Sequence, residues 1–379
     1  MNILITGGAG FIGHHISNKL VNQGHYVRIL DSLAPQIHGN IPVTFGWLAH
    51  PRIDFIRGSI LDRQTVVNAI AGITHIIHLA SETGTGQSMY EISKYNNVNS
   101  QGTAILLDVL SNSPDRLVEK FLLASSRSVY GEGAYTCSYC EGSASRQYPI
   151  SRSYDQLKKH QWEPICPNCK HPLISLATKE DDSLLPASVY AATKLAQEDL
   201  VRICCNSLDI DHVILRLQNV YGEGQSLHNP YTGILSIFST RIRHGLPLPI
   251  FEDGLETRDF VHVDDVADAF VLCLNQPEQM KVTLNIGSGI GTPVLEVAQQ
   301  LVDSLGSSVS INITADFRIG DIRHNKADIS RAVGLLGYAP QIDLTEGLKR
   351  FSQWASTQPL PEDNLEHANN ELRERKLMP

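Results

Sequence analysis

Tyr190 and Lys194 are the pair of side chains whose types and spacing most clearly suggest chemistry. They are four residues apart in a segment predicted as a helix, so both side chains lie on one face, one turn apart. A free tyrosine has a pKa of about 10 and is a poor base at neutral pH. A nearby lysine ammonium favours the phenolate and lowers that pKa, so the pair can serve as a general base. Such pairs also occur by chance, so the surrounding residues decide the interpretation.

Ser126 adds a hydroxyl to this pair. Ser125 and Ser126 follow a short apolar run, residues 121–124, which is predicted as a strand. The carboxyl ends of parallel strands form the edge of the sheet where ligands bind. A hydroxyl at this edge can hydrogen-bond the same substrate oxygen that Tyr190 deprotonates.

Four of the seven cysteines form two C-x-x-C pairs, Cys137 with Cys140 and Cys166 with Cys169. Residues 141–165, 25 in number, separate the pairs, which is typical of a zinc ribbon. Four thiolates complete a tetrahedral site and leave no position for water, so the expected zinc is structural. The alternatives are four unrelated thiols or a redox dithiol. His171 is expected to lie on the surface and not to bind the metal.

A glycine-rich segment at residues 7–13 separates a predicted strand from a predicted helix. Gly7 permits a tight turn, Gly10 lets a pyrophosphate approach the helix N-terminus, and Gly13 lets the helix pack close to the sheet. Asp31 ends the second predicted strand, where a carboxylate can accept hydrogen bonds from both ribose hydroxyls and repels a 2′-phosphate. These features favour NAD over NADP. The alternative is a glycine-rich turn that binds nothing.

The elements that must position these residues alternate along the first half of the chain. Short apolar runs predict strands at residues 1–6, 25–30, 53–56, 75–79, 121–124 and 213–217. Helical patterns lie between them, and a helix from about residue 188 to 205 carries Tyr190. Continuous apolar strands alternating with helices predict an α/β fold with a doubly wound parallel (Rossmann) sheet.

The composition predicts four segments. Residues 1–131 and 187–222 form the NAD-binding Rossmann domain, and the polar, cysteine-containing residues 132–186 form an inserted zinc ribbon. Residues 223–356 form mainly a smaller substrate-binding domain with returns to the Rossmann domain. Residues 357–379 are a polar tail that is expected to be loosely ordered.

The charge balance argues against a nucleic-acid partner. The formal net charge is -9, and binding by counterion release needs a basic surface. Between the cysteine pairs the cations are Arg146, Arg152, Lys158 and Lys159, and the anions are Glu141, Asp155 and Glu163, so the ribbon has no basic patch. No apolar run approaches the length of a spanning helix, so no membrane partner is expected. The N-terminus has no signal-peptide pattern, and a cytoplasmic location is the default expectation.

A set of motifs in this sequence resembles the extended short-chain dehydrogenase/reductase family, in its nucleotide-sugar epimerase and dehydratase branch. Besides the glycine segment and the Tyr190 motif, the motifs are HLAS at 78–81, NSQGT at 99–103, SSRSVYG at 125–131, LRLQNVYG at 215–222, RDFVHV at 258–263 and NIGSG at 285–289. The resemblance covers nearly the whole chain except the insertion and the tail.

The resemblance implies a role for each matching residue. Ser126, Tyr190 and Lys194 would be catalytic, with Lys194 also holding the nicotinamide ribose. The cofactor would contact Gly7, Gly10, Phe11, Ile12, Gly13, Asp31, Ser32, Ser59, Ile60, Leu79, Ala80, Ser81, Asn99, Tyr190 and Lys194. The nucleotide-diphosphate sugar would contact Ser126, Asn219, Pro249, Phe251, Arg258, Arg318 and Asp321. Ser59 departs from the family's usual Asp before Ile60, which weakens the expected adenine contact, and Arg258 could instead form a surface salt bridge with Asp259.

The residues after Ser126 indicate the reaction within this branch. Dehydratases of the family carry an Asp-Glu pair there, and decarboxylases carry a Glu, whereas this chain has Arg127 and Ser128. Redox chemistry without elimination remains, and 4-epimerisation through a 4-keto sugar is its simplest form. The alternatives are a nucleotide-sugar 4-ketoreductase and, from another class, a non-catalytic dinucleotide-binding regulator. Such regulators typically lack the Tyr or the Lys.

The insertion lies between Ser126 and Tyr190, so it is expected near the mouth of the site, where it would shape the sugar pocket or order a lid. A ribbon at this place is similar to a subgroup of dTDP-L-rhamnose 4-epimerases. The family usually forms homodimers through the helix that bears the Tyr and the helix near residues 102–110, and a homodimer is expected here.

Overall fold

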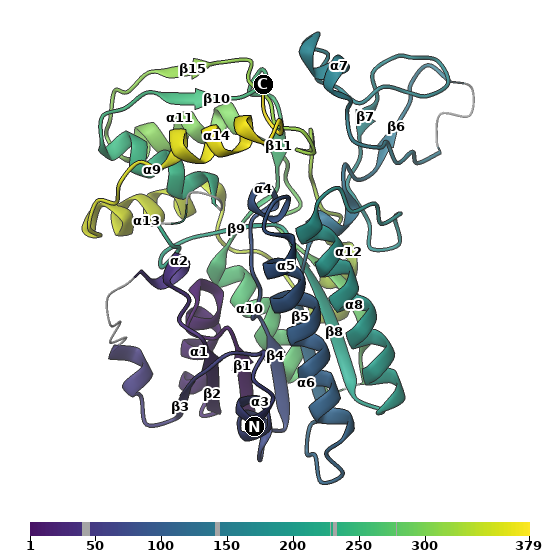
Figure 1. The fold of residues 1–379 in the computed structure, drawn as a ribbon, viewed down its shortest axis with the longest axis vertical. Coiled ribbons are helices and arrows are strands. Elements are labelled where there is room, and N and C mark those ends of the chain that lie inside the picture. Colours follow the sequence, from purple (N-terminus) through teal and green to yellow (C-terminus); the bar gives the residue numbers. More distant parts are fainter. Residues whose placement is uncertain (40–45, 141–144, 228, 230–232, 278) are drawn as a thin grey trace.

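A computed structural model describes residues 1–379 except 40–45, 141–144, 228, 230–232 and 278. Its centre is a seven-stranded sheet in the order β13-β8-β5-β4-β1-β2-β3 (Figure 1). The strands are β1 (Asn2–Thr6), β2 (Tyr26–Asp31), β3 (Ile53–Arg57), β4 (His75–His78), β5 (Lys120–Ser126), β8 (Asp211–Leu217) and β13 (Lys281–Ile286). Every neighbouring pair is parallel. The predicted doubly wound sheet is therefore confirmed, with small shifts of strand boundaries.

Both faces of this sheet are buried, which explains why its strands are continuous apolar runs. Along β1, Ile3 and Ile5 pack into one core and Leu4 into the other. The first core contains residues of α1 (Phe11–Asn22), α10 (Val263–Asn275) and α12 (Ser330–Leu336). The second contains residues of α3 (Arg63–Ile70), α6 (Gly102–Ser111) and α8 (Val189–Ser207).

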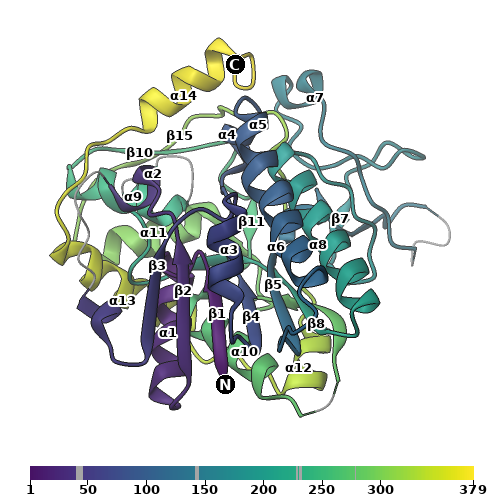
Figure 2. The ribbon, with the colours of Figure 1, turned by 60° about the horizontal axis from the view of Figure 1, so that its bottom comes forward.

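Shorter helical segments lie mostly around the carboxyl edge of the sheet. They are α2 (Pro35–His38), a 3₁₀ turn at Gly46–Ala49, α4 (Thr85–Ser88), α5 (Ile92–Tyr95), a π-helical turn at Asn96–Gln101 that joins α5 to α6, and a 3₁₀ turn at Arg127–Tyr130. Figure 2 shows the amino terminus at one end of the sheet and α4 and α5 at the other.

A further core lies beyond the carboxyl edge. Its elements are β9 (Asn219–Tyr221), α9 (Ile234–Arg243), β10 (Leu248–Ile250), β11 (Thr257–Arg258), β12 (Phe260–His262), β14 (Thr292–Pro293), α11 (Val294–Ser304), β15 (Ile311–Ile313) and α13 (Leu344–Thr357). Phe238, Leu301 and Phe351 are among its buried residues. β13 and α12 come from the same part of the chain but pack with the Rossmann sheet. The division into domains stays a prediction.

The insertion forms a small unit that projects from one side of the molecule (Figure 1). It contains β6 (Tyr135–Thr136), α7 (Tyr154–Lys158) and β7 (Ile174–Ser175), and β6 pairs with β7. Its own buried cluster consists of Tyr135, Cys137, Cys166 and Leu173. So small an apolar cluster contributes little stability, as expected for a unit that folds around a metal.

The expectation of a loosely ordered tail is wrong, because residues 365–374 form helix α14 (Leu365–Glu374). Leu365, Ala368, Asn369 and Leu372 are buried, at the i, i+3, i+4, i+7 spacing of one helix face. The polar composition of the tail concealed this periodicity. Among the described residues, no helix is long and apolar enough to cross a membrane.

Candidate functional site

The glycine segment forms a tight turn between β1 and α1. Gly7 has φ +68°, and a Cβ there would lie 2.7 Å from the backbone nitrogen of Ala80. A Cβ on Gly13 would lie 2.5 Å from the carbonyl oxygen of Gly8, so α1 can sit this close only with glycine. Gly10 caps α1 without a side-chain hydrogen bond, which leaves the helix N-terminus to a phosphate group. The turn fits the pyrophosphate of a dinucleotide.

Asp31 ends β2 beside this turn and is 8% exposed. Its carboxylate accepts hydrogen bonds from the backbone nitrogens of Ala9, at 3.0 Å, and Leu33, at 2.8 Å. His38 Nε2 lies 3.7 Å from the same carboxylate, and burial lowers the pKa of His38 although Asp31 opposes the shift. Asp31 is thus fixed where the adenosine ribose of NAD is expected.

The other predicted cofactor residues follow the carboxyl ends of neighbouring strands or start α1. Ser32 follows β2, Ser59 and Ile60 follow β3, Leu79, Ala80 and Ser81 follow β4, and Phe11 and Ile12 begin α1. Asn99 is fully buried, and its amide group bonds the backbone nitrogen of Glu82 at 2.7 Å and Thr193 Oγ1 at 2.9 Å. Asn99 therefore ties the loop after β4 to the helix that carries Tyr190.

Ser126, Tyr190 and Lys194 meet at the carboxyl edge, as predicted from their spacing. Ser126 ends β5 and Tyr190 is in the first turn of α8, where the Ser126 hydroxyl acts to lower the pKa of Tyr190. Ser188 caps α8 by accepting from the backbone nitrogen of Ala191 at 3.1 Å. Lys194 Nζ donates to the carbonyl of Ala124 at 3.0 Å and lies 5.9 Å from the centre of the Tyr190 ring.

Lys194 is not among the groups that lower the pKa of Tyr190 in this arrangement. Burial raises the pKa of Tyr190 above its ordinary value, and the groups that oppose this rise are Ser126 and Arg127. Burial also lowers the pKa of Lys194 to about 7. Lys194 directs its ammonium at a backbone carbonyl, so it anchors α8 to β5.

A buried ion pair further fixes α8 against the sheet. Arg216 of β8 and Glu198 of α8 pair at 2.7 Å, and Ser125 donates to the same carboxylate. Tyr130 accepts a hydrogen bond from Arg216 at 2.9 Å. These contacts join β5, β8, α8 and the turn after Ser126 into one support for the predicted catalytic side chains.

The predicted substrate residues cluster beyond Tyr190. Arg258, which is 8% exposed, lies 3.3 Å from the carboxylate of Asp321, and the guanidinium of Arg318 lies over the Phe251 ring at 4.9 Å. Burial opposes ionisation of Asp321, but Arg258, Arg318 and other arginines hold its pKa below the ordinary value. The alternative pairing of Arg258 with Asp259 is wrong. The fully buried Asp259 accepts from the backbone of Ser288 at 2.7 Å.

Two further predicted substrate residues flank this cluster. Pro249 is the middle residue of β10, and Asn219 is the first residue of β9. Within the described part of the chain, Asn219 Oδ1 and Arg318 Nε are buried and have no hydrogen-bond partner. Such atoms are free to hydrogen-bond a ligand or water that enters the site.

Arg127 is a site residue whose position was not foreseen from the sequence. It follows Ser126 directly, and its charge interacts with Tyr190, Arg258, Asp321 and Glu132. Burial, followed by the positive charge of Arg258, lowers the pKa of Arg127 to about 10. In the sequence, Arg127 shows that an acid is absent after Ser126, and its positive charge beside a predicted catalytic residue is a further signal.

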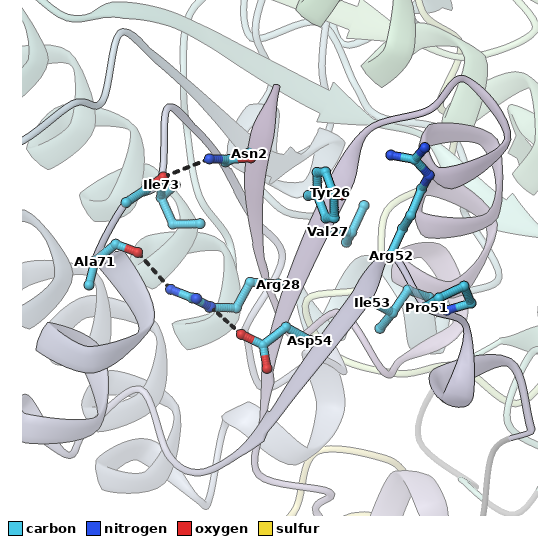
Figure 3. Close-up of a pocket in the computed structure, with 11 residues that line it drawn as sticks. Asn2, Tyr26, Val27, Arg28, Pro51, Arg52, Ile53, Asp54, Ala71 and Ile73 are labelled. Atoms are coloured by element: carbon cyan, nitrogen blue, oxygen red, sulfur yellow. Dashed lines mark hydrogen bonds and ion pairs between the residues drawn. The ribbon is translucent and has the colours of Figure 1, made fainter.

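Two pockets lie at opposite ends of the sheet. A pocket of about 70 Å³ is lined by α4, the start of α8, residues 318–321 and α14, and so borders the site. Another of about 370 Å³ lies at the amino ends of β1, β2 and β3. Figure 3 shows Arg28 there, bonded to Asp54 and to the carbonyl of Ala71. Its position opposite the catalytic edge separates it from the reaction.

The four cysteines of the insertion converge on one point. Their sulfurs all lie within 4.8 Å of one another, with Cys137 and Cys169 at 3.4 Å and Cys140 and Cys166 at 3.7 Å. Sulfurs bound to one zinc at about 2.3 Å stand about 3.8 Å apart in a tetrahedron. Four thiolates this close together repel one another, and a cation between them would remove that repulsion. The cluster fits zinc.

Comparison with known proteins agrees with this geometry. The model of the NAD dependent epimerase/dehydratase family matches residues 3–170 and 164–287. A dTDP-L-rhamnose 4-epimerase of Burkholderia thailandensis is 39% identical, over 93% of this chain and 94% of its own. A putative UDP-glucose 4-epimerase of Methanocaldococcus jannaschii is 30% identical, over 93% of this chain and 97% of its own.

Solved structures extend the comparison to the fold. A UDP-glucuronic acid 4-epimerase from Bacillus cereus, in complex with UDP-glucuronic acid and NAD, superposes with a TM-score of 0.75 at 27% identity. The superposition covers 94% of this chain and 99% of that one. The resemblance seen in the motifs is thereby confirmed. The chain belongs to the NAD-dependent epimerase/dehydratase family.

Proposed function

We propose that this protein is an NAD-dependent 4-epimerase of a nucleotide-diphosphate sugar, with a dTDP-linked L-rhamnose as the favoured substrate. The observation that carries the proposal is that a candidate base, Tyr190, and a candidate anion-binding site occur together. Ser126 and Tyr190 lie at the carboxyl edge, at the end of β5 and the start of α8, and the charges of Arg258 and Arg318 act on Asp321 beyond them. A sugar joined to a diphosphate needs this arrangement. The relative from Burkholderia thailandensis supports the choice of sugar.

Each catalytic side chain has one task in this proposal. Tyr190 takes the proton of the C4 hydroxyl, and Ser126 hydrogen-bonds the same oxygen. The glycine turn and Asp31 hold NAD, which when bound accepts a hydride from the sugar carbon and returns it. Arg127 stands where an acidic pair would drive loss of water, so the sugar keeps its remaining hydroxyls.

The proposal also covers a bound zinc ion, the oligomeric state and the cellular location of the protein. One zinc ion bound by Cys137, Cys140, Cys166 and Cys169 would stabilise the insertion and take no part in the reaction. Two chains would form a homodimer through α6 and α8. Four reduced thiols suit a reducing compartment, so we infer a cytoplasmic location.

The test is conversion of sugars by the purified protein without added cofactor. dTDP-, UDP-, GDP- and CDP-sugars would be incubated with the enzyme and followed by NMR. We expect dTDP-L-rhamnose and its C4 epimer to interconvert to the same mixture from either side, with NAD retained by the protein. Net consumption of NADH would instead identify a 4-ketoreductase, and no conversion of any sugar would favour a binding protein.

Tyr190→Phe tests the assignment of the base. General acid–base catalysis contributes about 10²- to 10⁴-fold, so we expect kcat to fall by about that factor while bound NAD is unchanged. Tyr95→Phe is the matched control, because the Tyr95 ring contacts Tyr190 edge-on and its hydroxyl binds the carbonyl of Thr83. A Tyr190→Phe enzyme as fast as the control would remove Tyr190 from the mechanism.

A further inference from the structure

The insertion contacts the substrate-binding segment through buried charges. The Arg152–Arg323 network consists of Glu132, Arg152 and Glu163 from the insertion and Glu252, Asp253 and Arg323 from the region beyond the sheet. Arg152 is 4% exposed and Arg323 is 1% exposed. Long charged side chains are almost never this buried unless they are paired, so the network holds a defined geometry.

Arg152 bridges the insertion and the substrate-binding segment. Its guanidinium donates to the Glu252 carboxylate at 2.7 Å and to the backbone carbonyl of Asp321 at 3.1 Å. It also donates to the carbonyl of Trp162 at 2.9 Å, and its Nε lies 3.4 Å from Glu132. A guanidinium offers five donors in a rigid fork, and Arg152 divides them between the two units.

Glu163 and Glu132 hold the next residues of the same segment. The Glu163 carboxylate pairs with Arg323 at 2.8 Å and with His324 at 3.0 Å. The Glu132 carboxylate accepts from the backbone nitrogen of Arg323 at 2.9 Å. The insertion therefore contacts residues 321–324 through hydrogen bonds to the backbone and ion pairs with side chains.

Arg258 contacts the same segment. Its guanidinium donates to the carbonyls of Ile322 at 2.8 Å and Arg323 at 3.1 Å and pairs with the Asp321 carboxylate. Residues 321–323 thus bond both the insertion and Arg258, a predicted substrate residue. A displacement of this segment moves Asp321 and Arg258 together.

We propose that Arg152 is a positioning residue of the nucleotide-sugar site, through which the ribbon insertion fixes Asp321 and Arg258 for the nucleoside diphosphate. Arg152 acts through the Asp321 carbonyl and does not itself touch the substrate. The inference rests on the proposed function for the identity of the ligand. It gives the insertion a task in substrate binding, since a misplacement of about 1 Å weakens a site strongly.

The test compares two arginines of the insertion. Arg152→Lys keeps a positive charge between Glu132 and Glu252 but loses the fork that also reaches Asp321. Arg146→Lys is the matched control, because Arg146 pairs with Asp182 at 2.6 Å and with the carbonyl of Ala177, away from the substrate segment. Calorimetry with dTDP and with UDP measures binding of the nucleoside diphosphate alone. Zinc content, bound NAD and the melting temperature are measured on the same samples.

We expect Arg152→Lys to weaken binding of the preferred diphosphate roughly tenfold and to raise KM similarly with kcat nearly unchanged. Arg146→Lys should bind like the wild type. Wild-type affinity in Arg152→Lys, or equal weakening in both variants, would overturn the proposal. A wild type that binds neither diphosphate would instead refute the proposed function.

A second variant keeps the test open if Arg152→Lys folds poorly. Glu163 is half-buried. Glu163→Gln therefore removes the negative charge that pairs with Arg323 and His324, at little cost to folding. We expect it to weaken diphosphate binding several-fold with zinc content unchanged. Unchanged binding in a folded Glu163→Gln protein would also overturn the proposal.

Discussion

Arg127 sets the electrostatic environment of Tyr190. Burial raises the pKa of Tyr190, and the Ser126 hydroxyl and the Arg127 charge are the groups that lower it again. Lys194 donates instead to the carbonyl of Ala124. The cation that most directly stabilises the phenolate in this arrangement therefore comes from the turn after β5 and not from α8.

Arg127→Met is expected to shift the pH dependence of the reaction. Loss of this charge raises the pKa of Tyr190 further, because the phenolate loses a favourable interaction. Tyr190 acts as a base only when it is deprotonated, so the acidic limb of the kcat/KM profile should move to higher pH and activity at neutral pH should fall. Initial rates between about pH 6 and about pH 10 measure the acidic limb of the kcat/KM profile.

Arg127→Lys is the control for this shift, since it keeps the charge beside Tyr190. Its acidic limb should stay near that of the wild type. If Arg127→Met had the wild-type limb, the assigned interaction between Arg127 and Tyr190 would be wrong.

At the scale of elements, the proposed zinc would stabilise the ribbon more than its small apolar core does. Among its described residues, the buried apolar cluster around the cysteines consists of Tyr135, Cys137, Cys166 and Leu173. Cys137→Ser removes one of four ligands, so we expect zinc below one equivalent per chain and a lower melting temperature. Mass spectrometry of the metal and thermal unfolding measure both. Cys204→Ser, outside the cluster, should leave both unchanged, and full zinc content in Cys137→Ser would exclude this site.

The C-terminal helix α14 is a second element that contacts the substrate side. Asn369 accepts a hydrogen bond from Arg318 at 2.9 Å, and the Leu377 carbonyl accepts from the backbone nitrogen of Ile319 at 2.9 Å. Gly86 of α4 lies close to α14, since a Cβ added to Gly86 would be 3.7 Å from Cδ2 of Leu372. The tail thus packs against both the loop after β15 and α4, on either side of the smaller pocket.

Asn369→Ala is expected to raise KM for the nucleotide sugar several-fold, because Arg318 loses the partner that orients it. One lost hydrogen bond to a charged group is worth about 1.5–3 kcal/mol, which sets the upper limit of the effect. Steady-state kinetics measure the change. Asn370→Ala, one position along on the exposed face, is the control. Equal KM values in the two variants would show that α14 does not orient Arg318.

The whole molecule shows which features follow from local sequence and which do not. Strand positions, the glycine turn and the spacing of Tyr190 and Lys194 were predicted, because short apolar runs and fixed offsets along a helix are local patterns. The contact of Arg152 with Asp321 joins residues 169 positions apart. Only the folded chain reveals such a pairing. The direction of the Lys194 ammonium likewise depends on the distance between α8 and β5.

Assembly is the remaining property at this scale, and Ile203 tests it. α6 and α8 pack side by side on one face of the sheet, and Ile203 on α8 is 58% exposed. If two chains associate through these helices, Ile203→Glu places an unpaired charge in the interface at a cost of about 3–5 kcal/mol, or more than about a hundredfold in the dimer Kd. We therefore expect light scattering after gel filtration to find a dimer for the wild type and a monomer for Ile203→Glu. Ile174→Glu, at a 52% exposed position of the ribbon, should remain dimeric, and a dimeric Ile203→Glu protein would place the interface elsewhere.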